Sequence, residues 1–284
     1  MIAQRPRSAV QWLLLGLAVA LALVLLVIPL ILIFSLALSD GLQALWANLT
    51  ADYMLHAIWL TVLTALVSVP LNLVFGIMLA WCVTHYDFFG RRLLVALVDI
   101  PYAMSPVVAG FCYLIVYGME GLFGPWLSAH NIQLMFAWPG ILMVTVFVTS
   151  PYVARNLIPL IQEQGTDEEV AALSLGASGW TIFRRVTLPN IKWGLLYGSV
   201  LTNARAVGEF GAVAVVSGTI MNQTLTLPLL VDQLNNDYKV AAAFTAASLL
   251  ACMAMITLLL KTIMEGVANR RRRLASLEAA PSSR

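Results

Sequence analysis

The sequence predicts an all-α integral membrane protein with six transmembrane helices, and three observations lead to this fold class. The 284 residues are 61% hydrophobic and only 11% charged, whereas a soluble domain has about 25% charged residues. Six long apolar segments alternate with short polar linkers, which hold most of the charged residues. Lys and Arg are concentrated in every second linker, as the positive-inside rule predicts for a multi-pass protein.

The predicted spans are about 11–38, 56–84, 93–117, 136–159, 192–216 and 240–264. Each is long enough to cross a hydrocarbon core of about 30 Å as a helix, and helices are required because lipid leaves backbone groups without hydrogen-bond partners. The apolar stretch between Arg7 and Asp40 is too long for a cleaved signal peptide, so it is predicted to remain as the first span. Residues 11–264 then form the transmembrane domain.

The positive charges predict that both termini face the cytoplasm, with residues 1–10 as the N-terminal segment and 265–284 as a basic tail. Fourteen Lys and Arg residues fall on that side, Lys239 alone falls on the other, and Arg205 lies inside a span. The cytoplasmic set is Arg5, Arg7, Arg91, Arg92, Arg155, Arg184, Arg185, Lys192, Lys261, Arg270, Arg271, Arg272, Arg273 and Arg284.

The third span contains two prolines that interrupt its helix. Pro101 and Pro106 bracket Ser105, and each proline removes a backbone donor from the helical ladder. Freed backbone groups are tolerated at membrane depth where they line a cavity or are buried in protein. Ser105, together with Ser217 at the end of the fifth span, is therefore a candidate for donating hydrogen bonds along a solute pathway.

The polar stretch 160–190, called the elbow below, lies between the fourth and fifth spans and predicts two short helices. Thr166 and Glu169 have the spacing of a capping box at the start of the first helix. Gly176 is suited to the left-handed position that ends this helix. Ser178 is predicted to cap the second helix and Pro189 to end it.

The second predicted helix of the elbow places Trp180 and Phe183 near one face, beside Arg184 and Arg185. Two interpretations remain open on this evidence. The elbow is either an amphipathic connector that rests on the lipid surface, or a coupling helix that inserts into a groove on a soluble partner.

The fifth span carries two charged residues four positions apart, Arg205 and Glu209, on one helical face. A charged side chain at membrane depth costs at least about 2.5–3.5 kcal/mol, and an Arg–Glu pair lowers that cost. One interpretation is a structural ion pair that fixes helix packing. The other is that Arg205 faces a pathway for anions, while Glu209 neutralises it when no anion is present.

Several functions are excluded or disfavoured by the composition. The net charge of +2 is too small for nucleic-acid binding. His56, His85 and His130 are scattered and form no metal-ligand cluster, and the three cysteines are interpreted as small buried apolar residues. No P-loop and no nucleophile elbow occur in the sequence. We therefore expect no catalytic residue, no metal and no cofactor.

The elbow resembles the conserved loop of ABC importer permeases, whose pattern is E-A-A, three residues, G, nine residues, I-x-L-P. In this chain Ala171, Ala172, Gly176, Leu188 and Pro189 match, Val186 replaces the isoleucine, and Val170 stands in place of the first glutamate. The resemblance implies the fold of type I importer permeases, with the elbow as coupling helix. It implies contact with a separate ATPase through Glu168, Glu169, Ala171, Ala172, Gly176, Trp180, Phe183 and Pro189.

The fifth span resembles the R-A-x-G-E-F-G-A signature of the sulfate and molybdate branch of these permeases, beginning at Arg205. Residues 99–110, 216–229 and 241–250 look more specifically like sulfate/thiosulfate permeases of the W type. The resemblance covers roughly 50–264. It implies a bacterial inner-membrane importer that also contains a homologous second permease, two cytoplasmic ATPase subunits and a periplasmic binding protein, with Arg205, Glu209, Ser105 and Ser217 as candidate pathway residues.

Three alternatives remain at this stage. A molybdate or tungstate permease would use the same signature in the fifth span. A secondary anion transporter needs no ATPase and predicts inverted repeats, which the sequence does not contain. A membrane scaffold without transport activity would leave the charged fifth span without a purpose.

Overall fold

The computed structural model describes residues 9–278, and this part of the chain is helical with no β-strand. Its helices in chain order are α1 (Ala9–Ala22), η1 (Leu23–Val27), α2 (Ile28–Ala37), α3 (Leu42–Leu49), α4 (Asp52–His85), α5 (Arg91–Ala103), α6 (Pro106–Tyr117), α7 (Gly124–Ala129), α8 (Trp138–Gln164), α9 (Asp167–Ser174), α10 (Gly179–Ile182), η2 (Phe183–Thr187), α11 (Leu188–Val207), α12 (Gly211–Val216), α13 (Leu227–Asn236) and α14 (Val240–Glu278). The predicted all-α class is confirmed.

The predicted count of six spans is not confirmed. Within residues 9–278, four helices are long and apolar enough to cross a membrane: 10–37, 52–85, 138–164 and 240–264. A fifth is obtained if α5 and α6, which meet at an angle of 110°, are taken as one broken span. The predicted fifth span is not among these helices: α11 carries Lys192 and Arg205 and ends at Val207, and the chain is interrupted at 208–210 before α12.

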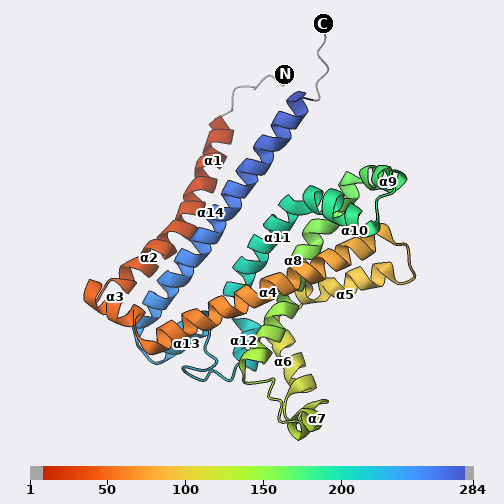
Figure 1. Cartoon of the computed structure of the whole chain (residues 1–284). Coiled ribbons are helices and arrows are strands. Elements are labelled where there is room, and N and C mark those ends of the chain that lie inside the picture. The colour runs from red at the N-terminus through yellow and green to blue at the C-terminus, as the bar shows by residue number, and fades with distance from the viewer. Residues whose placement is uncertain (1–8, 279–284) are drawn as a thin grey trace.

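Three long helices, α4, α8 and α11, pack together and form the body of the molecule (Figure 1). Helices α4 and α8 approach each other closely at Gly76 of α4, where a Cβ atom would lie 2.5 Å from Cγ1 of Val153 on α8. A side chain at position 76 would therefore separate the two helices. The main apolar core lies beyond this contact, toward α12, α13 and the start of α14.

Helix α2 packs against α14, and the segment formed by α1, η1 and α2 extends away from this body toward the N-terminus, as α14 does toward the C-terminus (Figure 1). Nearly every apolar side chain of 10–32 is exposed, as expected for a segment that faces lipid or another subunit. The N-terminal end of α1 and the C-terminal end of α14 lie at the same end of the molecule as α9 and α10, whereas α3 and α7 lie at the other end (Figure 1).

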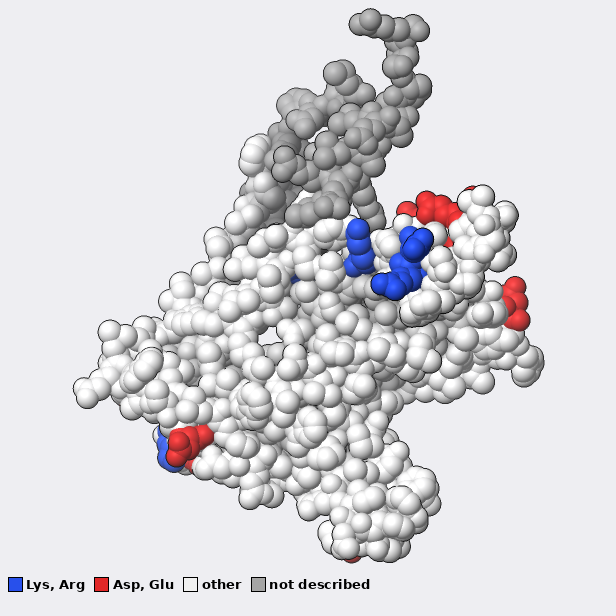
Figure 2. Space-filling view, viewed as in Figure 1, with Lys and Arg blue, Asp and Glu red and all other residues white. Residues whose placement is uncertain are grey.

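On the face shown in Figure 2, charged side chains lie mainly at these two ends, and most of the surface between them carries none. This distribution fits a molecule whose middle zone lies in lipid, where unpaired charges are costly. Two of the cysteines predicted to be buried, Cys82 and Cys112, are instead exposed, and Cys252 is half-buried. The prediction was wrong because an apolar run does not reveal which of its faces points to lipid.

Candidate functional site

The elbow backbone follows the predicted two-helix pattern in its first half. Helix α9 ends at Ser174, and Gly176 adopts a left-handed conformation with φ of +83°. The N–H groups of Gly176 and Ala177 donate to the carbonyls of Leu173 and Ala172, at 2.9 and 3.1 Å. This is the Schellman arrangement, and it satisfies carbonyls that the helix end would otherwise leave without partners.

Two details of the elbow were predicted incorrectly. The side chain of Thr166 makes no capping hydrogen bond, and the carboxylate of Glu169, which the predicted capping box would direct to the N–H of Thr166, is engaged elsewhere. Pro189 does not end the second helix. The chain continues from α10 through the π-helical turn η2 into α11. Because the turn is wider at η2, Pro189, which has no N–H, fits here without breaking an α-helical hydrogen bond. The capping of α10 by Ser178, which accepts from the N–H of Thr181, is as predicted.

Both carboxylates of the predicted coupling set bind within the chain. Oε2 of Glu169 lies 2.7 Å from Nε2 of His85 at the end of α4, and Oε1 accepts a hydrogen bond of 2.5 Å from Thr187. Oε2 of Glu168 accepts from the side-chain amide of Asn190 at 2.6 Å. The sequence analysis missed His85 and Asn190, because nothing local to either residue indicates a partner in α9.

The outer surface of the elbow is apolar although it is exposed. Helix α9 has no buried residue, and Val170, Leu173 and Leu175 are all exposed. Trp180 is 70% exposed and stacks on Phe183, which is half-buried and meets the ring of Trp81 edge-on. Exposed apolar groups on an ordered support are typical of an interaction surface. The remaining predicted elbow residues, Ala171, Ala172, Gly176 and Pro189, lie on or beside it.

The second candidate site is the break in the fifth predicted span. Arg205 lies in the last turn of α11, and Glu209 lies in the interruption before α12. Nη1 of Arg205 is 2.6 Å from Oε2 of Glu209, whose side chain is only 1% exposed, whereas that of Arg205 is 27% exposed. Oε1 of Glu209 also accepts from the N–H of Ala212, so this carboxylate both neutralises Arg205 and caps α12.

The breaks of the third and fifth predicted spans lie next to each other. A Cβ atom built on Gly211 would lie 3.2 Å from Cβ of Pro106, and one built on Gly110 would lie 2.8 Å from the carbonyl oxygen of Ala212. Helices α6 and α12 are therefore in close contact through glycine. The break in the third predicted span occurs at 104–105, after Pro101 and just before Pro106, as predicted from these two prolines.

The two candidate serines differ in their surroundings. Ser105 is exposed in the break before α6, and its hydroxyl makes no capping bond. Ser217, at the end of α12, is fully buried, and its hydroxyl accepts from the N–H of Thr219 at 3.2 Å. The structure thus brings an accessible hydroxyl, a partly accessible guanidinium and two helix interruptions into one region.

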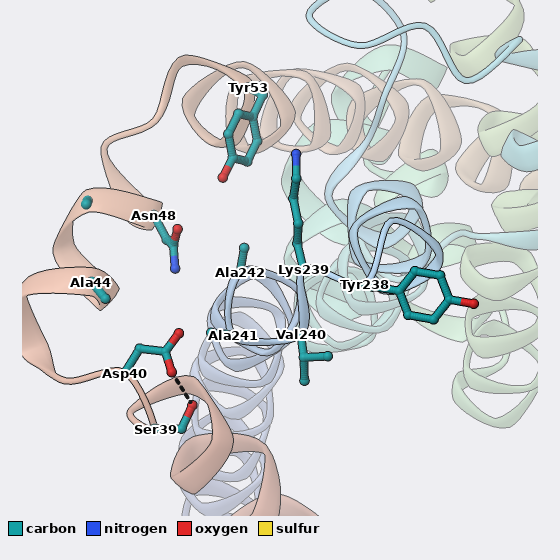
Figure 3. A pocket seen from close by; sticks show the side chains of 11 residues that line it. Ser39, Asp40, Ala44, Asn48, Tyr53, Tyr238, Lys239, Val240, Ala241 and Ala242 are labelled. Atoms are coloured by element: carbon teal, nitrogen blue, oxygen red, sulfur yellow. Dashed lines mark hydrogen bonds between the residues drawn. The ribbon is translucent and has the colours of Figure 1, made fainter.

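The end of the molecule opposite the elbow has an open cavity of about 660 Å³. Its lining comes from the α2–α3 turn, α3, the start of α4 and the α13–α14 junction, and includes Asp40, Asn48, Tyr53 and Lys239 (Figure 3). Because the lining carries one acidic and one basic residue, its charge does not favour anions. Among the described residues, no three metal-ligating side chains form a cluster.

Comparison with known proteins decides the family. Residues 72–273 match the family described as the binding-protein-dependent transport system inner membrane component. The chain belongs to this family. It is a transport permease subunit of an ABC importer and an inner-membrane component. The predicted resemblance is thereby confirmed.

Individual relatives are similar over almost the whole chain. The sulfate transport system permease protein CysW of Escherichia coli (strain K12) is 56% identical over 92% of this chain and 90% of its own length. CysW of Synechocystis sp. is 48% identical over 90% of this chain and 93% of its own length. The sulfate transport system permease protein CysT of Escherichia coli (strain K12) is 34% identical over 75% of this chain and 77% of its own length.

A solved structure supports the fold independently of sequence. The bacterial alginate ABC transporter in complex with alginate pentasaccharide-bound periplasmic protein contains a chain that matches with a TM-score of 0.75. The match covers 92% of this chain and 94% of that chain at 16% identity. The fold is that of the type I ABC importer permeases.

Proposed function

We propose that this chain is one of two homologous permease subunits of an ATP-driven importer of sulfate or thiosulfate. The observation that carries the proposal is the ordered elbow with its exposed apolar surface, in a chain 56% identical to a sulfate permease. An amphipathic connector lying on lipid would need no carboxylates fixing its first helix to two other helices, as Glu168 and Glu169 do.

The partners of the chain follow from this proposal. The second permease is a CysT-like subunit, and two cytoplasmic ATPase subunits bind the elbows, one on each permease. A periplasmic binding protein delivers the anion to the opposite end. Both termini and the elbow then face the cytoplasm. This agrees with the ends of α1 and α14 lying at the same end of the molecule as α9 and α10 (Figure 1), and with the distribution of Lys and Arg.

The anion pathway passes the adjacent breaks of α5–α6 and α11–α12. Arg205 attracts the anion, and Glu209 competes with it for the guanidinium, so that the anion is held weakly and can leave. Ser105 donates a neutral hydrogen bond from the neighbouring break, whereas Ser217 acts only if the region around α12 opens. When the ATPases close on ATP, they move the elbows and the attached helices, and hydrolysis returns them.

A matched pair of tryptophans tests the elbow. Trp180 and Trp46 are 70% and 69% exposed but lie at opposite ends of the molecule. We expect W180E to abolish co-purification of the ATPase and ATP-dependent uptake of radiolabelled sulfate, because a charge cannot enter an apolar groove. We expect W46E to leave ATPase co-purification intact. Retention of the ATPase by W180E contradicts the proposed coupling.

The substrate is tested by competition. Uptake of radiolabelled sulfate into vesicles containing the complete importer should be inhibited by unlabelled thiosulfate and not by an equal concentration of molybdate. Strong inhibition by molybdate would favour the molybdate or tungstate alternative. Uptake by this chain alone, driven by an ion gradient without ATPase, would favour a secondary transporter.

A further inference from the structure

A single carboxylate, that of Glu169, connects three helical elements of the elbow end. It lies on α9, its Oε2 contacts His85 at the end of α4, and its Oε1 accepts from Thr187 at the end of η2. The side chains of His85 and Glu169 are only 14% and 15% exposed, and Thr187 is buried. We call these three residues the latch. Contacts so shielded from water are screened less than exposed ion pairs.

His85 is itself held in a fixed orientation. Its ring stacks on Trp81, with centroids 3.9 Å apart and an interplanar angle of 11°. Nδ1 lies 2.9 Å from the hydroxyl oxygen of Thr84 and 3.2 Å from the carbonyl oxygen of Trp81. With the ring held in this way, Nε2 points at the carboxylate oxygen of Glu169, 2.7 Å away. The histidine therefore presents a directed donor to Glu169.

The latch matters because little else holds α9 in place. No residue of α9 is buried, so this helix contributes no side chain to the apolar core. Besides the covalent connections, the polar contact between Glu168 and Asn190 is the other side-chain bond from α9 to the rest of the described chain, and it is exposed. The position of the coupling helix thus depends on polar contacts, which have directional geometry.

The two elements joined by the latch run toward the other sites. Helix α4 extends over 34 residues from the latch to the end that bears the open cavity. Thr187 directly precedes α11, and α11 ends at the Arg205–Glu209 break. We infer that His85 and Glu169 are positioning residues for energy coupling, which make α9 move together with α4 and α11. This inference rests on the proposed function as an ABC importer permease.

The central experiment measures sulfate uptake and ATP hydrolysis together, in proteoliposomes containing the complete importer. Removal of the latch should lower the number of anions moved per ATP hydrolysed. Without it, α9 can move with the ATPase while α4 and α11 stay in place. We expect E169A and H85A each to lower this ratio about 5-fold or more, and E169Q to lower it less, because glutamine still accepts from Thr187. The double variant H85A/E169A should be no worse than E169A, since coupled residues are not additive.

Asp167 provides the matched control, since it lies on the same helix, is exposed and has no partner in the described structure. D167N should leave the ratio within about 1.5-fold of wild type, as expected of an exposed charge. A parallel fall of uptake and hydrolysis in E169A, with an unchanged ratio, would overturn the latch as a coupling device. The latch would also be overturned if the double variant H85A/E169A lowered the ratio by the product of the two single effects, because the two residues would then act independently.

A second measurement separates failure of the latch from failure of the proposed function. If the wild-type assembly shows no ATP-dependent uptake, the proposed function fails, and hydrogen exchange of the full chain in detergent then tests the latch alone. Faster exchange of amides 167–178 in E169A than in D167N supports the latch. Equal exchange in the two variants overturns it.

Discussion

We expect the two single variants of the Arg205–Glu209 pair to lose different amounts of stability, because water reaches the two side chains to different degrees. R205M leaves a carboxylate that is 1% exposed and retains only the hydrogen bond from Ala212. Breaking a buried pair in this way costs about 3–5 kcal/mol. E209Q leaves a guanidinium that is 27% exposed, so the same cost is reduced by solvent to about 1–2 kcal/mol.

The double variant R205M/E209Q removes both charges. Replacement of a whole buried pair by neutral groups is close to neutral, so its stability should be within about 1 kcal/mol of wild type. The glutamine keeps an oxygen for the N–H of Ala212. The predicted order of stability is therefore wild type and the double variant first, then E209Q, then R205M. Denaturant unfolding of the purified full chain in detergent, followed by tryptophan fluorescence, measures it.

Two results would refute the reasoning. If R205M is no less stable than E209Q, exposure does not determine the cost of losing a partner at this site. If the double variant is as unstable as the sum of the single variants, the two residues do not interact. Sulfate uptake then separates the two interpretations of the pair. A stable double variant that cannot transport indicates that Arg205 acts on the anion, whereas one that transports normally indicates a structural pair.

Three further predictions concern backbone and packing. G176A should destabilise the elbow by about 1 kcal/mol, because the φ of +83° at this position is strained for alanine. G179A should not, because a Cβ atom at Gly179 meets no atom within 4 Å and its φ is not in the left-handed region. Hydrogen exchange of the elbow compares the two variants. G76A should lower the denaturation midpoint by the equivalent of about 1–3 kcal/mol, since its Cβ would lie 2.6 Å from Cβ of Val153, and G179A again serves as control. N72D should destabilise by at least about 2.5–3.5 kcal/mol as a charge within a span. N72L loses the 2.6 Å hydrogen bond that Nδ2 of Asn72 donates to Thr149, but it also removes a buried Oδ1 that has no partner among the described residues, so it should stay within about 1 kcal/mol of wild type. Equal unfolding curves for N72D and N72L would contradict this.

The long helices were predictable because their signal is local. The predicted spans 56–84 and 136–159 correspond to α4 (52–85) and α8 (138–164), so the predicted ends differ from the observed ones by at most five residues. The break at 104–105 lies between the two prolines of the third predicted span, as expected from the backbone donors that they remove. The left-handed Gly176 and the cap at Ser178 were likewise predictable, because each involves residues within one turn.

The contacts of the carboxylates were not predictable from the sequence. Glu169 has a suitable partner three residues away in Thr166, yet it binds His85, which is distant along the chain but adjacent in space. Glu169 binds His85 and Thr187 because these contacts are shielded from water where three helical elements meet. A local sequence pattern does not show which elements meet in space. The break at 208–210 was missed for a similar reason, because Glu209 caps α12 through Ala212 and so replaces the helical ladder with a side chain.

The latch and the Arg205–Glu209 pair lie at opposite ends of one helix, and this explains how the elbow can affect the anion pathway. Thr187 and Arg205 are separated by about 27 Å at a rise of 1.5 Å per residue. In each site the carboxylate is bound by its own partner within the chain, and a direct interaction between charges this far apart is weak. An effect of the elbow on Arg205 must therefore be carried by movement of α11 as a stiff element, together with α4 and α8 packed against it. The Gly76–Val153 contact keeps these helices close enough to move together.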